Sequence, residues 1–273
     1  MPELPEVETI RRGLAPLVRG RRILGVRVNE CRLREPLRTR DLRRLRGATV
    51  TDVRRRSKYL LLDTSVGLTL LVHLGMTGRL WVSDRRRSSR PHEHVVFVLD
   101  DGRDLRFADA RRFGLIKVLK SGRVLLHPRI QCLGPEPLDD RLTGEVLYRA
   151  TRGRRRPVKN FLLDTRAIAG VGNIYACEAL HRAGLDPRRA VGGMGRRAWA
   201  RLTVRLKQVL GEAIRAGGTT LRDFLNAEED AGSFAIALRV YDREGKPCGR
   251  CHAAIRRIVQ AGRATFYCPR CQR

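Results

Sequence analysis

The sequence predicts an α+β protein, with an N-terminal antiparallel β-sandwich flanked by helices, then a helical region and a short C-terminal hairpin. Three observations support this fold class. Short runs of β-forming residues fill residues 23–119, helical periodicity dominates after Gly134, and four of the seven cysteines follow residue 247. At 273 residues and 42% hydrophobic content, the chain is long enough for about two cores.

The first predicted element is an amphipathic helix that starts at Pro5. Apolar residues recur there at helical spacing, and glutamates come early, where they complement the positive end of a helix. The apolar positions are Val7, Ile10, Leu14 and Leu17.

The following strands are short and separated by Gly, Asp and Ser turns, a pattern typical of an antiparallel sandwich. The runs are ILGVRV, YLLLDT, LTLLVHL, RLWVS, HVVFVLD, DLRFAD and LIKVL. After a boundary near residue 134, helices are expected at about 140–150, 157–163, 174–183 and 196–216. Residues 255–267 alternate β-forming residues around Ala261 and Gly262, which predicts a hairpin.

The charge indicates a polyanionic partner. Lys and Arg number 57 against 28 Asp and Glu, a formal net charge of +29, which excludes an ordinary acidic enzyme. A small DNA site needs only about six to ten phosphate contacts, so most of these cations are solvated surface and charge alone does not locate a site. The arginine clusters at 85–87 and 154–156 lie in loop-like contexts, which disfavours a basic membrane-surface helix.

The chain is expected to be a soluble intracellular protein. No apolar run approaches the roughly 18 to 20 residues that span a bilayer, and the N-terminus MPELPEVE is acidic where a signal peptide is basic.

The C-terminal cysteines predict one structural zinc ion. Two C-x2-C pairs separated by sixteen residues supply four thiolates, which close a tetrahedron and leave no open position for water. The alternative, a pair of disulfides, is disfavoured in a reducing compartment. The ligands are Cys248, Cys251, Cys268 and Cys271.

Pro2 is a candidate nucleophile. Removal of Met1 would expose a secondary amine, and an N-terminal amine with a pKa of about 7.7 to 8.0 is partly unprotonated at neutral pH. Its attack on a sugar C1′ would give an iminium that acts as an electron sink for elimination. A proline at the start of a helix is an equally good interpretation of the residues alone.

Six motifs lie along essentially the whole chain: PELPEVET, LGMTGRL, DARRFG, VGNIYACEAL, PCGRC and CPRCQR. Together they resemble the formamidopyrimidine-DNA glycosylases, which are bifunctional base-excision repair enzymes. The resemblance implies three parts: a catalytic β-sandwich at 2–134, a helix-two-turn-helix domain with a lesion-capping loop at 135–237, and a four-cysteine zinc finger at 238–273. It also implies excision of 8-oxoguanine and formamidopyrimidines from double-stranded DNA by a monomer in the bacterial cytoplasm, associated with the nucleoid.

The resemblance assigns five catalytic residues. Pro2 would form the Schiff base, Glu3 would be its acid/base partner, and Glu6 would orient the sugar or a water. Lys58 would contact phosphate and donate protons during β,δ-elimination, and Arg263 would grip the phosphate beside the lesion. Without the resemblance, Glu3 is equally a helix-dipole residue and Lys58 is a surface lysine.

The resemblance also assigns DNA contacts. Met76, Arg111 and Phe113 would fill the space left by an everted base, although Met76 and Phe113 alone are typical of core packing. Asn173 begins a predicted helix, where its side chain and the helix N-terminus would bind a phosphate, cap the helix or do both. The other candidates are His73 and His92, which are equally core histidines, Arg154, Lys159 and the weaker Tyr241.

Two other functions stay open. An endonuclease VIII-like enzyme would act on oxidised pyrimidines, and the residues Thr219–Ala237, expected to cap the lesion, do not reveal which base is accepted. A non-enzymatic zinc-ribbon protein that binds damaged DNA would not need Pro2 or the Glu3 and Lys58 pair.

Overall fold

The computed structural model describes residues 2–218 and 238–273, which form two compact units. Among these residues, the first unit comprises 2–131 and 217–218, and the second comprises 132–216 and 238–273. The chain thus changes unit after Gln131, near the boundary predicted at 134. The boundary predicted at 237 lies outside the described residues, and the division into three parts stays a prediction.

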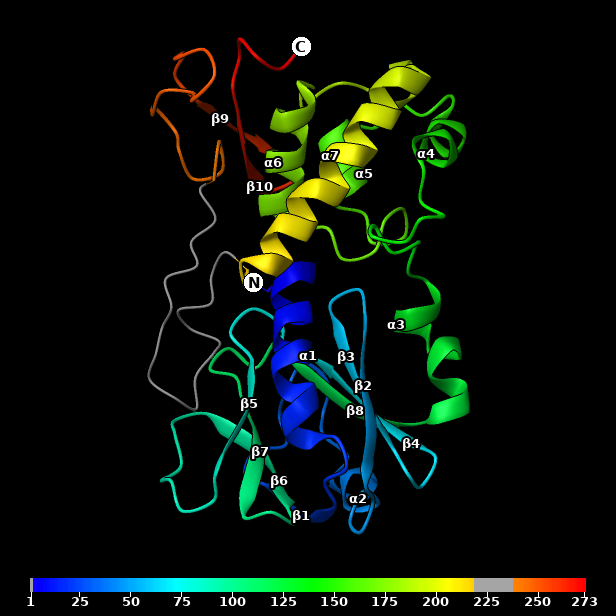
Figure 1. Cartoon of the computed structure of the whole chain (residues 1–273), viewed down its shortest axis with the longest axis vertical. Coiled ribbons are helices and arrows are strands. Elements are labelled where there is room, and N and C mark those ends of the chain that lie inside the picture. The colour runs from blue at the N-terminus through cyan, green and yellow to red at the C-terminus, as the bar shows by residue number, and fades with distance from the viewer. Residues whose placement is uncertain (1, 219–237) are drawn as a thin grey trace. The chain divides into compact units, whose positions relative to one another are not determined.

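The first unit contains two four-stranded antiparallel sheets (Figure 1). The first sheet has the order β1-β6-β7-β5, with β1 at Ile23–Val28, β6 at Glu93–Leu99, β7 at Arg103–Ala108 and β5 at Arg79–Asp84. The second has the order β2-β3-β4-β8, with β2 at Val50–Arg56, β3 at Tyr59–Thr64, β4 at Leu68–His73 and β8 at Leu115–Lys120. The predicted α+β class with an antiparallel β-sandwich is confirmed.

Both sheets share one apolar core. Phe97 and Phe107 from the first sheet belong to the same cluster as Leu62 and Val72 from the second. Each strand supplies its inward residues to this cluster, because side chains alternate between the faces of a strand. The short helix α2 (Thr39–Arg43) adds Leu42.

Helix α1 (Leu4–Val18) lies against this core through Val7, Ile10 and Leu14. The sequence predicted that Leu17 would continue the apolar face, but Leu17 is 36% exposed and Val18 is buried instead. The reason is geometric, since a residue four positions after Leu14 returns to the same helix face more closely than one three positions after it.

The second unit is helical. Its helices are α4 (Gly144–Thr151), α5 (Val158–Leu162), α6 (Asn173–Ala183), the short η2 (Val191–Gly193) and α7 (Arg196–Arg215). The predicted helix start at 140 is wrong, because Thr143 caps α4 by accepting a hydrogen bond from Val146 N–H at 3.2 Å. The helices pack around the buried Trp199, whose ring meets the edge of Phe161 at a centroid distance of 5.5 Å.

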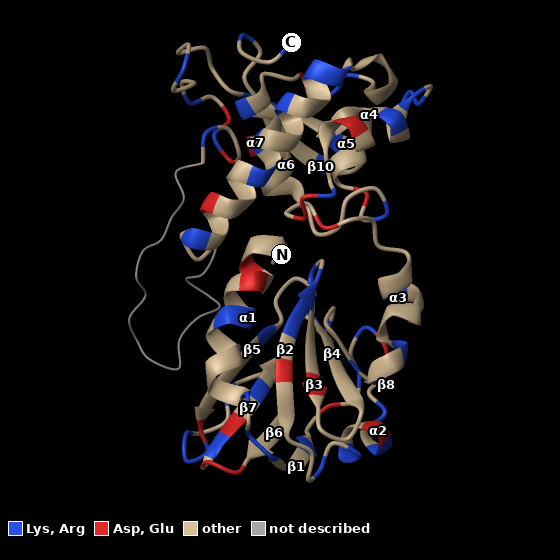
Figure 2. Cartoon of the chain, turned by 45° about the vertical axis from the view of Figure 1, so that its right-hand side comes forward, with Lys and Arg blue, Asp and Glu red and all other residues tan. Residues whose placement is uncertain are grey.

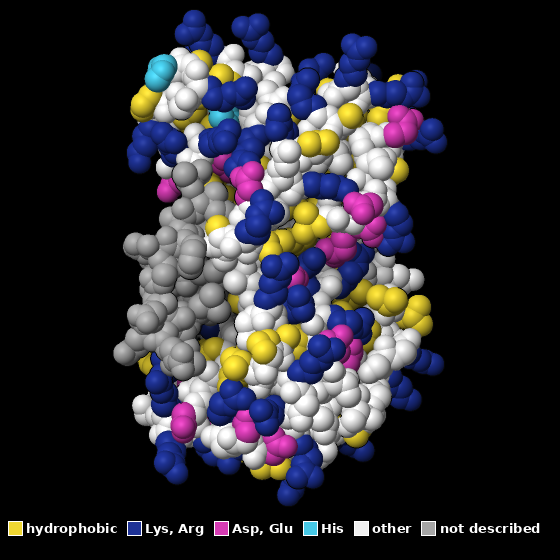
Figure 3. Space-filling model, viewed as in Figure 1, with side chains coloured by type: hydrophobic (Ala, Val, Ile, Leu, Met, Phe, Trp, Pro, Cys, Tyr) yellow, Lys and Arg dark blue, Asp and Glu magenta, His cyan; other side chains and the backbone are white. Residues whose placement is uncertain are grey.

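The remaining elements are short. In the first unit, η1 (Ser121–Leu126) and α3 (Pro128–Gln131) follow β8. In the second unit, β9 (Arg256–Gln260) and β10 (Arg263–Tyr267) form the predicted hairpin, which packs against α6. Its turn residues Ala261 and Gly262 have φ values of 48° and 72°. Lys and Arg side chains are spread over the face of each unit that Figure 3 shows.

Candidate functional site

Pro2, Glu3 and Glu6 lie together at the start of α1, and all three are buried. The Glu3 side chain accepts a hydrogen bond from the backbone N–H of Glu6, and Glu6 Oε2 accepts one from the N–H of Glu3 at 2.9 Å. This reciprocal cap holds both carboxylates close to Pro2. A Cβ added at Gly218 would lie 3.1 Å from Glu6 Oε1, so glycine allows the backbone to approach this carboxylate.

The position of Pro2 bears on its interpretation as a helix-start proline. A proline that starts a helix occupies the first helical position, where its fixed φ suits the helix. Here Glu3 is the N-cap, Leu4 is the first helical residue and Pro5 the second, so Pro2 lies before the helix. Pro5 is therefore the proline of the first helical turn, and Pro2 lies outside the helix and does not start it.

Lys58 lies on the tight turn between β2 and β3, and it is only 8% exposed. The preceding Ser57 has a φ of 56°, in the left-handed region. Arg55 holds this turn, because its guanidinium donates to Glu8 Oε2 at 3.1 Å and to the Ser57 carbonyl at 2.9 Å. The turn is thereby tied to α1, and Figure 2 shows the basic end of β2 that leads into it.

His73 ends β4 and is uncharged at neutral pH. Burial lowers the pKa of His73 to about 4, helped by the positive charge of Lys58 and other nearby cations. Its Nδ1 accepts a hydrogen bond from Gly75 N–H at 3.0 Å, so the ring proton is on Nε2. The ring also contacts Tyr59, with centroids 4.8 Å apart. His73 therefore offers one neutral N–H donor.

Met76, Arg111 and Phe113 lie on two loops and are not part of the core. Met76 is 39% exposed and Phe113 is 45% exposed. The Arg111 guanidinium lies 4.7 Å from the centroid of the Phe113 ring, a cation–π distance. The core-packing interpretation of Met76 and Phe113 is wrong, and an exposed apolar pair beside a cation is suited to contact with a base step.

Asp109 fixes these two loops to one another. Its carboxylate is fully buried and accepts from Thr77 Oγ1 at 2.5 Å, from Arg111 N–H at 3.3 Å and from Gly114 N–H at 2.6 Å. A Cβ at Gly75 would lie 2.5 Å from the carbonyl carbon of Phe113, so only glycine allows this approach. Sequence reasoning missed Asp109, although an aspartate that opens the turn DARRFG is a signal for backbone hydrogen bonding.

Lys159 is the main correction among the DNA contacts that the sequence predicted. Its side chain is fully buried, and Nζ donates to Thr265 Oγ1 at 2.6 Å and to the Ala264 carbonyl at 3.2 Å. An ammonium buried in this way requires these partners and is not presented to a DNA backbone. Lys159 therefore ties α5 to β10 and positions the hairpin.

Asn173 makes a similar connection from α6. The N-cap of α6 is Gly172, which has no side-chain cap, so the capping interpretation of Asn173 is wrong. Its Nδ2 instead donates to the Ala264 carbonyl at 2.8 Å. The same carbonyl thus accepts from Lys159 and Asn173.

Glu178 is a second residue that sequence reasoning missed. It is buried on α6, and its carboxylate accepts from the backbone N–H groups of Arg239, Val240 and Tyr241 at 2.9 to 3.0 Å. The Tyr241 ring meets Phe266 edge-on, with centroids 5.2 Å apart. Tyr241 is thus part of the packing that fixes the zinc finger.

Three other candidates are exposed. His92 precedes β6 and has a φ of 65°, Arg154 lies between α4 and α5, and Arg263 is the first residue of β10. Because Arg263 directly follows the hairpin turn, its guanidinium is presented by a backbone that the zinc finger and the Ala264 carbonyl hold in place.

The four C-terminal cysteines fit a tetrahedral zinc ion. Their Sγ atoms all lie within 4.8 Å of one another, with Cys248 and Cys271 at 4.0 Å and Cys251 and Cys268 at 3.4 Å. Zn–S bonds of about 2.3 Å place tetrahedral sulfur atoms about 3.8 Å apart. His181 Nε2 lies 3.6 Å from Cys248 Sγ, where it is suited to support that thiolate.

Comparisons with known proteins agree with this geometry along the chain. Residues 1–116 match the formamidopyrimidine-DNA glycosylase N-terminal domain, residues 133–225 match the H2TH domain of that enzyme, and residues 245–273 match the zinc finger found in FPG and IleRS. The chain is 48% identical to the formamidopyrimidine-DNA glycosylases of Cereibacter sphaeroides and Stenotrophomonas maltophilia, with both chains covered completely.

The chain belongs to the formamidopyrimidine-DNA glycosylase family. It is therefore a DNA glycosylase and AP lyase of base excision repair, and its four cysteines hold one structural zinc ion. The predicted family, enzyme class and metal are confirmed.

Solved structures of the family have the same fold. The Lactococcus lactis formamidopyrimidine-DNA glycosylase bound to DNA containing N7-benzyl-Fapy-dG has a TM-score of 0.89 and 30% sequence identity to this chain, with both chains covered completely. Its complex with DNA containing an abasic site also has a TM-score of 0.89 and is 29% identical. Among the described residues, no helix is long and apolar enough to cross a membrane.

Proposed function

We propose that this family member excises oxidised purines, 8-oxoguanine and formamidopyrimidines, from double-stranded DNA and then cleaves the strand by β,δ-elimination. The observation that carries the proposal is the buried group of Pro2, Glu3 and Glu6 before and within the first turn of α1. The Lactococcus lactis relative has been solved with DNA containing Fapy-dG and with DNA containing an abasic site, which supports this choice of substrate.

Pro2 is the nucleophile in this proposal. After removal of Met1, its secondary amine forms a bond to C1′ of the damaged nucleotide as the glycosidic bond breaks, and the base leaves with a proton. Opening of the sugar ring gives an iminium that needs no further proton loss from nitrogen. Glu3 protonates the opened sugar and moves protons during elimination, because its carboxylate is fixed close to Pro2. Glu6 orients the sugar or a water.

The elimination steps are assigned to two cations. Lys58 contacts a phosphate and donates a proton, and its turn is held by Arg55. Arg263 binds the phosphate beside the lesion and assists the final elimination. His73, His92, Arg154, Asn173 and Tyr241 complete the DNA contacts, with His73 acting through its Nε2–H.

Base extrusion is assigned to the two loops that Asp109 joins. Phe113 parts the base step, Met76 fills the space, and Arg111 hydrogen-bonds the orphaned base. The loop proposed to cap the lesion, residues 219–237, lies outside the described residues. The enzyme acts as a monomer in the bacterial cytoplasm, associated with the nucleoid, and its parts are 2–134, 135–237 and 238–273.

Borohydride trapping tests the assignment of Pro2. The wild-type chain should become covalently linked to a duplex containing 8-oxoguanine, and Pro2→Gly should trap weakly through its primary amine. A form that retains Met1 should trap nothing. Pro5→Ala is the matched control, because it changes a proline of the same segment and leaves the terminal amine intact. Full trapping by the form that retains Met1 would overturn the assignment.

Oxidised pyrimidines are the second candidate substrate. The Lactococcus lactis relative has also been solved with DNA containing an oxidised pyrimidine, with a TM-score of 0.88 to this chain. Trapping on two duplexes that differ only in the lesion separates the candidates. Faster trapping on the duplex with 8-oxoguanine supports oxidised purines as the substrate. Faster trapping on the duplex with the oxidised pyrimidine would mean that oxidised pyrimidines are the preferred substrate instead.

A further inference from the structure

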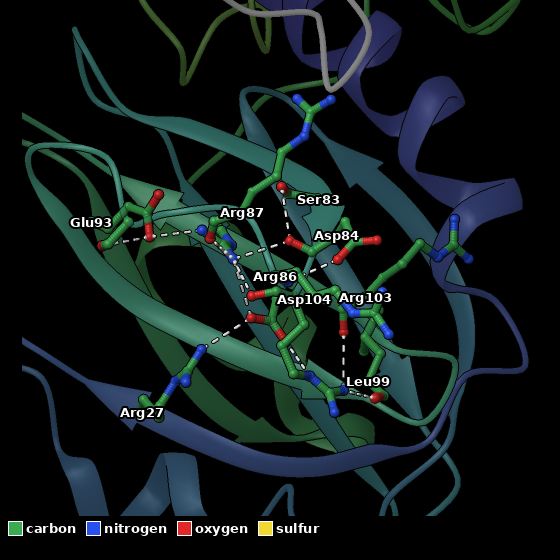
Figure 4. Close-up of polar contacts among 12 residues, drawn as sticks. Arg27, Ser83, Asp84, Arg86, Arg87, Glu93, Leu99, Arg103 and Asp104 are labelled. Carbon is green, nitrogen blue, oxygen red and sulfur yellow. Dashed lines mark hydrogen bonds and ion pairs between the residues drawn. The ribbon is translucent and has the colours of Figure 1, made fainter.

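The sheet β1-β6-β7-β5 carries a buried carboxylate that contacts more guanidinium groups than are required to neutralise its charge. Asp104 on β7 is fully buried and contacts Arg27 at 3.0 Å, Arg85 at 3.2 Å and Arg106 at 3.4 Å (Figure 4). A single guanidinium is enough to neutralise one carboxylate, so this cluster keeps an excess of positive charge.

Arg106 organises the loop between β5 and β6. It is 3% exposed, and its terminal nitrogens donate to the backbone carbonyls of Asp84, Arg87 and Ser88 at 3.1 to 3.3 Å. Glu93 lies 3.5 Å from its NH1 and provides its second carboxylate neighbour. The Nε of Arg106 is buried and has no hydrogen-bond partner among the described residues. The loop is thus built on a guanidinium that retains one unused donor.

A cavity of about 430 Å³ opens beside this cluster. Its size falls within the range of small-molecule sites. Arg27, Arg85, Arg87 and Arg106 line it together with one carboxylate, Glu93. When the neighbouring Asp104 is counted with Glu93, the four guanidinium groups still outnumber the carboxylates by two, so the cavity has a net positive charge. Arg87 is exposed and no hydrogen bond of its side chain is found in the described structure, so it can turn towards a ligand. Arg27 is also exposed, and only its NH2 group is bound to Asp104, which leaves its other N–H groups for a ligand.

We infer that this cavity binds a phosphoryl group. Guanidinium groups match the oxygens of phosphate in bidentate geometry and do so better than an ammonium, and the lining cations are all arginines. The cavity is lined only by residues of the first unit, and none of them belongs to the proposed lesion site. The phosphoryl group is either that of a free pyrophosphate-like anion or a phosphodiester of the DNA that flanks the lesion.

Two double variants with equal loss of charge test the inference. Arg27→Gln with Arg87→Gln removes two lining cations and leaves Asp104 paired with Arg85 and Arg106. The control, Arg43→Gln with Arg46→Gln, removes two exposed cations of the same unit that neither line the cavity nor adjoin its lining residues in the chain. Thermal unfolding checks that both variants fold.

The first arm measures pyrophosphate binding by isothermal titration calorimetry at an ionic strength of about 0.15 M, where the Debye length is about 8 Å. The zinc-loaded full chain is first saturated with a short duplex containing an abasic-site analogue, bound non-covalently, so that the lesion site is occupied whether or not Pro2 is the nucleophile. We expect one pyrophosphate per chain, bound at least about tenfold more weakly by the Arg27 and Arg87 variant, because one charge-assisted hydrogen bond is worth about that factor. The control should stay within about twofold of wild type, since its two exposed charges do not line the cavity and are screened by salt.

The second arm identifies the source of the phosphoryl group by comparing short and long duplexes. If the cavity holds flanking DNA, the Arg27 and Arg87 variant binds the long duplex more weakly than wild type does, whereas both bind the short duplex equally well. The slope of log K against log salt concentration for the long duplex then becomes less negative by about 0.9 for each lost phosphate contact. If long-duplex binding is unchanged while pyrophosphate binding is lost, the ligand is a free anion. No saturable pyrophosphate binding together with unchanged long-duplex affinity, or equal losses in both double variants, overturns the inference.

Discussion

Replacing Asp109 by asparagine should damage base extrusion more than bond cleavage. All three groups that contact this carboxylate are donors: Thr77 Oγ1, Arg111 N–H and Gly114 N–H. Asp109→Asn replaces one accepting oxygen by an NH₂ group, which cannot accept. A donor would then face a donor inside a fully buried site, and the two loops that carry Met76 and Phe113 would separate.

The magnitude follows from these contacts. A hydrogen bond to a charged group contributes about 1.5–3 kcal/mol, and a buried donor left without a partner costs about 1–3 kcal/mol. Asp109→Asn should therefore lower the free energy of unfolding by about 3 kcal/mol. Thr77→Val is the milder companion, because it removes one donor and leaves the carboxylate bonded to Arg111 and Gly114, so its loss should be about 1 kcal/mol.

Urea unfolding at pH 7 measures the free energy of unfolding, and single-turnover kinetics measure the rate of reaction on each substrate. Asp109→Asn should be much slower on paired 8-oxoguanine than on a pre-formed abasic site, where no base has to be extruded. Phe113→Ala should show the same difference between substrates with a smaller effect on stability, because Phe113 is exposed. A change in stability below about 0.5 kcal/mol together with equal rate losses on both substrates would refute the reasoning.

Three further outcomes are expected. Cys268→Ser should lose zinc and duplex affinity together, because folding of so short a hairpin depends on the metal, and full zinc stoichiometry in the variant would contradict this. Lys159→Met should weaken binding to undamaged and damaged duplex while leaving zinc content unchanged, since it removes two hydrogen bonds to β10; unaltered binding would show that the buried ammonium does not position the hairpin. Burial by itself raises the pKa of Glu8, but hydrogen bonds from Arg11 and Arg12 outweigh it and lower this pKa to about 2. The charged Glu8 carboxylate thus stabilises the folded state fully above pH 4.5, and this stabilisation is lost as the pH falls towards 2. In urea unfolding, the free energy of unfolding of Glu8→Gln should be about 2 kcal/mol lower than that of wild type above pH 4.5, and this difference should narrow as the pH falls. A difference that stays constant with pH would contradict the prediction.

The features that the sequence predicted well depend on local signals. Alternating β-forming runs and Gly or Asp turns mark seven of the eight strands in the two sandwich sheets, and the spacing of Cys248, Cys251, Cys268 and Cys271 defines a metal site without any tertiary information. The strand that was missed is β2 (Val50–Arg56), whose sequence VTDVRRR ends in three arginines and gives only a weak apolar alternation. Helix ends were less well predicted, as at α4, where the capping geometry of Thr143 decides the start.

The features that it missed depend on contacts between distant segments. Lys159 is typical of a surface lysine or a DNA contact in sequence, and only the packing of α5 against a strand more than one hundred residues later shows that it is buried. Asp109 and Glu178 have the same character, because each accepts hydrogen bonds from backbone amides whose arrangement exists only in the folded chain. No pattern in one sequence marks an aspartate as buried before its donors are in place.

The zinc ion and the proposed phosphate contact are linked through one backbone carbonyl. Ala264 follows Arg263 in β10, and its carbonyl accepts from Lys159 on α5 and Asn173 on α6. The zinc ion fixes the hairpin at its cysteine end, whereas these two side chains fix it near the turn, where Arg263 is exposed. Since the buried Lys159 and the half-buried Asn173 would both lose a hydrogen bond to this carbonyl if the hairpin moved, the folded finger and the helices stabilise one position of Arg263. If Arg263 binds the phosphate as proposed, the metal contributes to DNA binding indirectly, because it reduces the conformational freedom of the backbone that presents this exposed arginine.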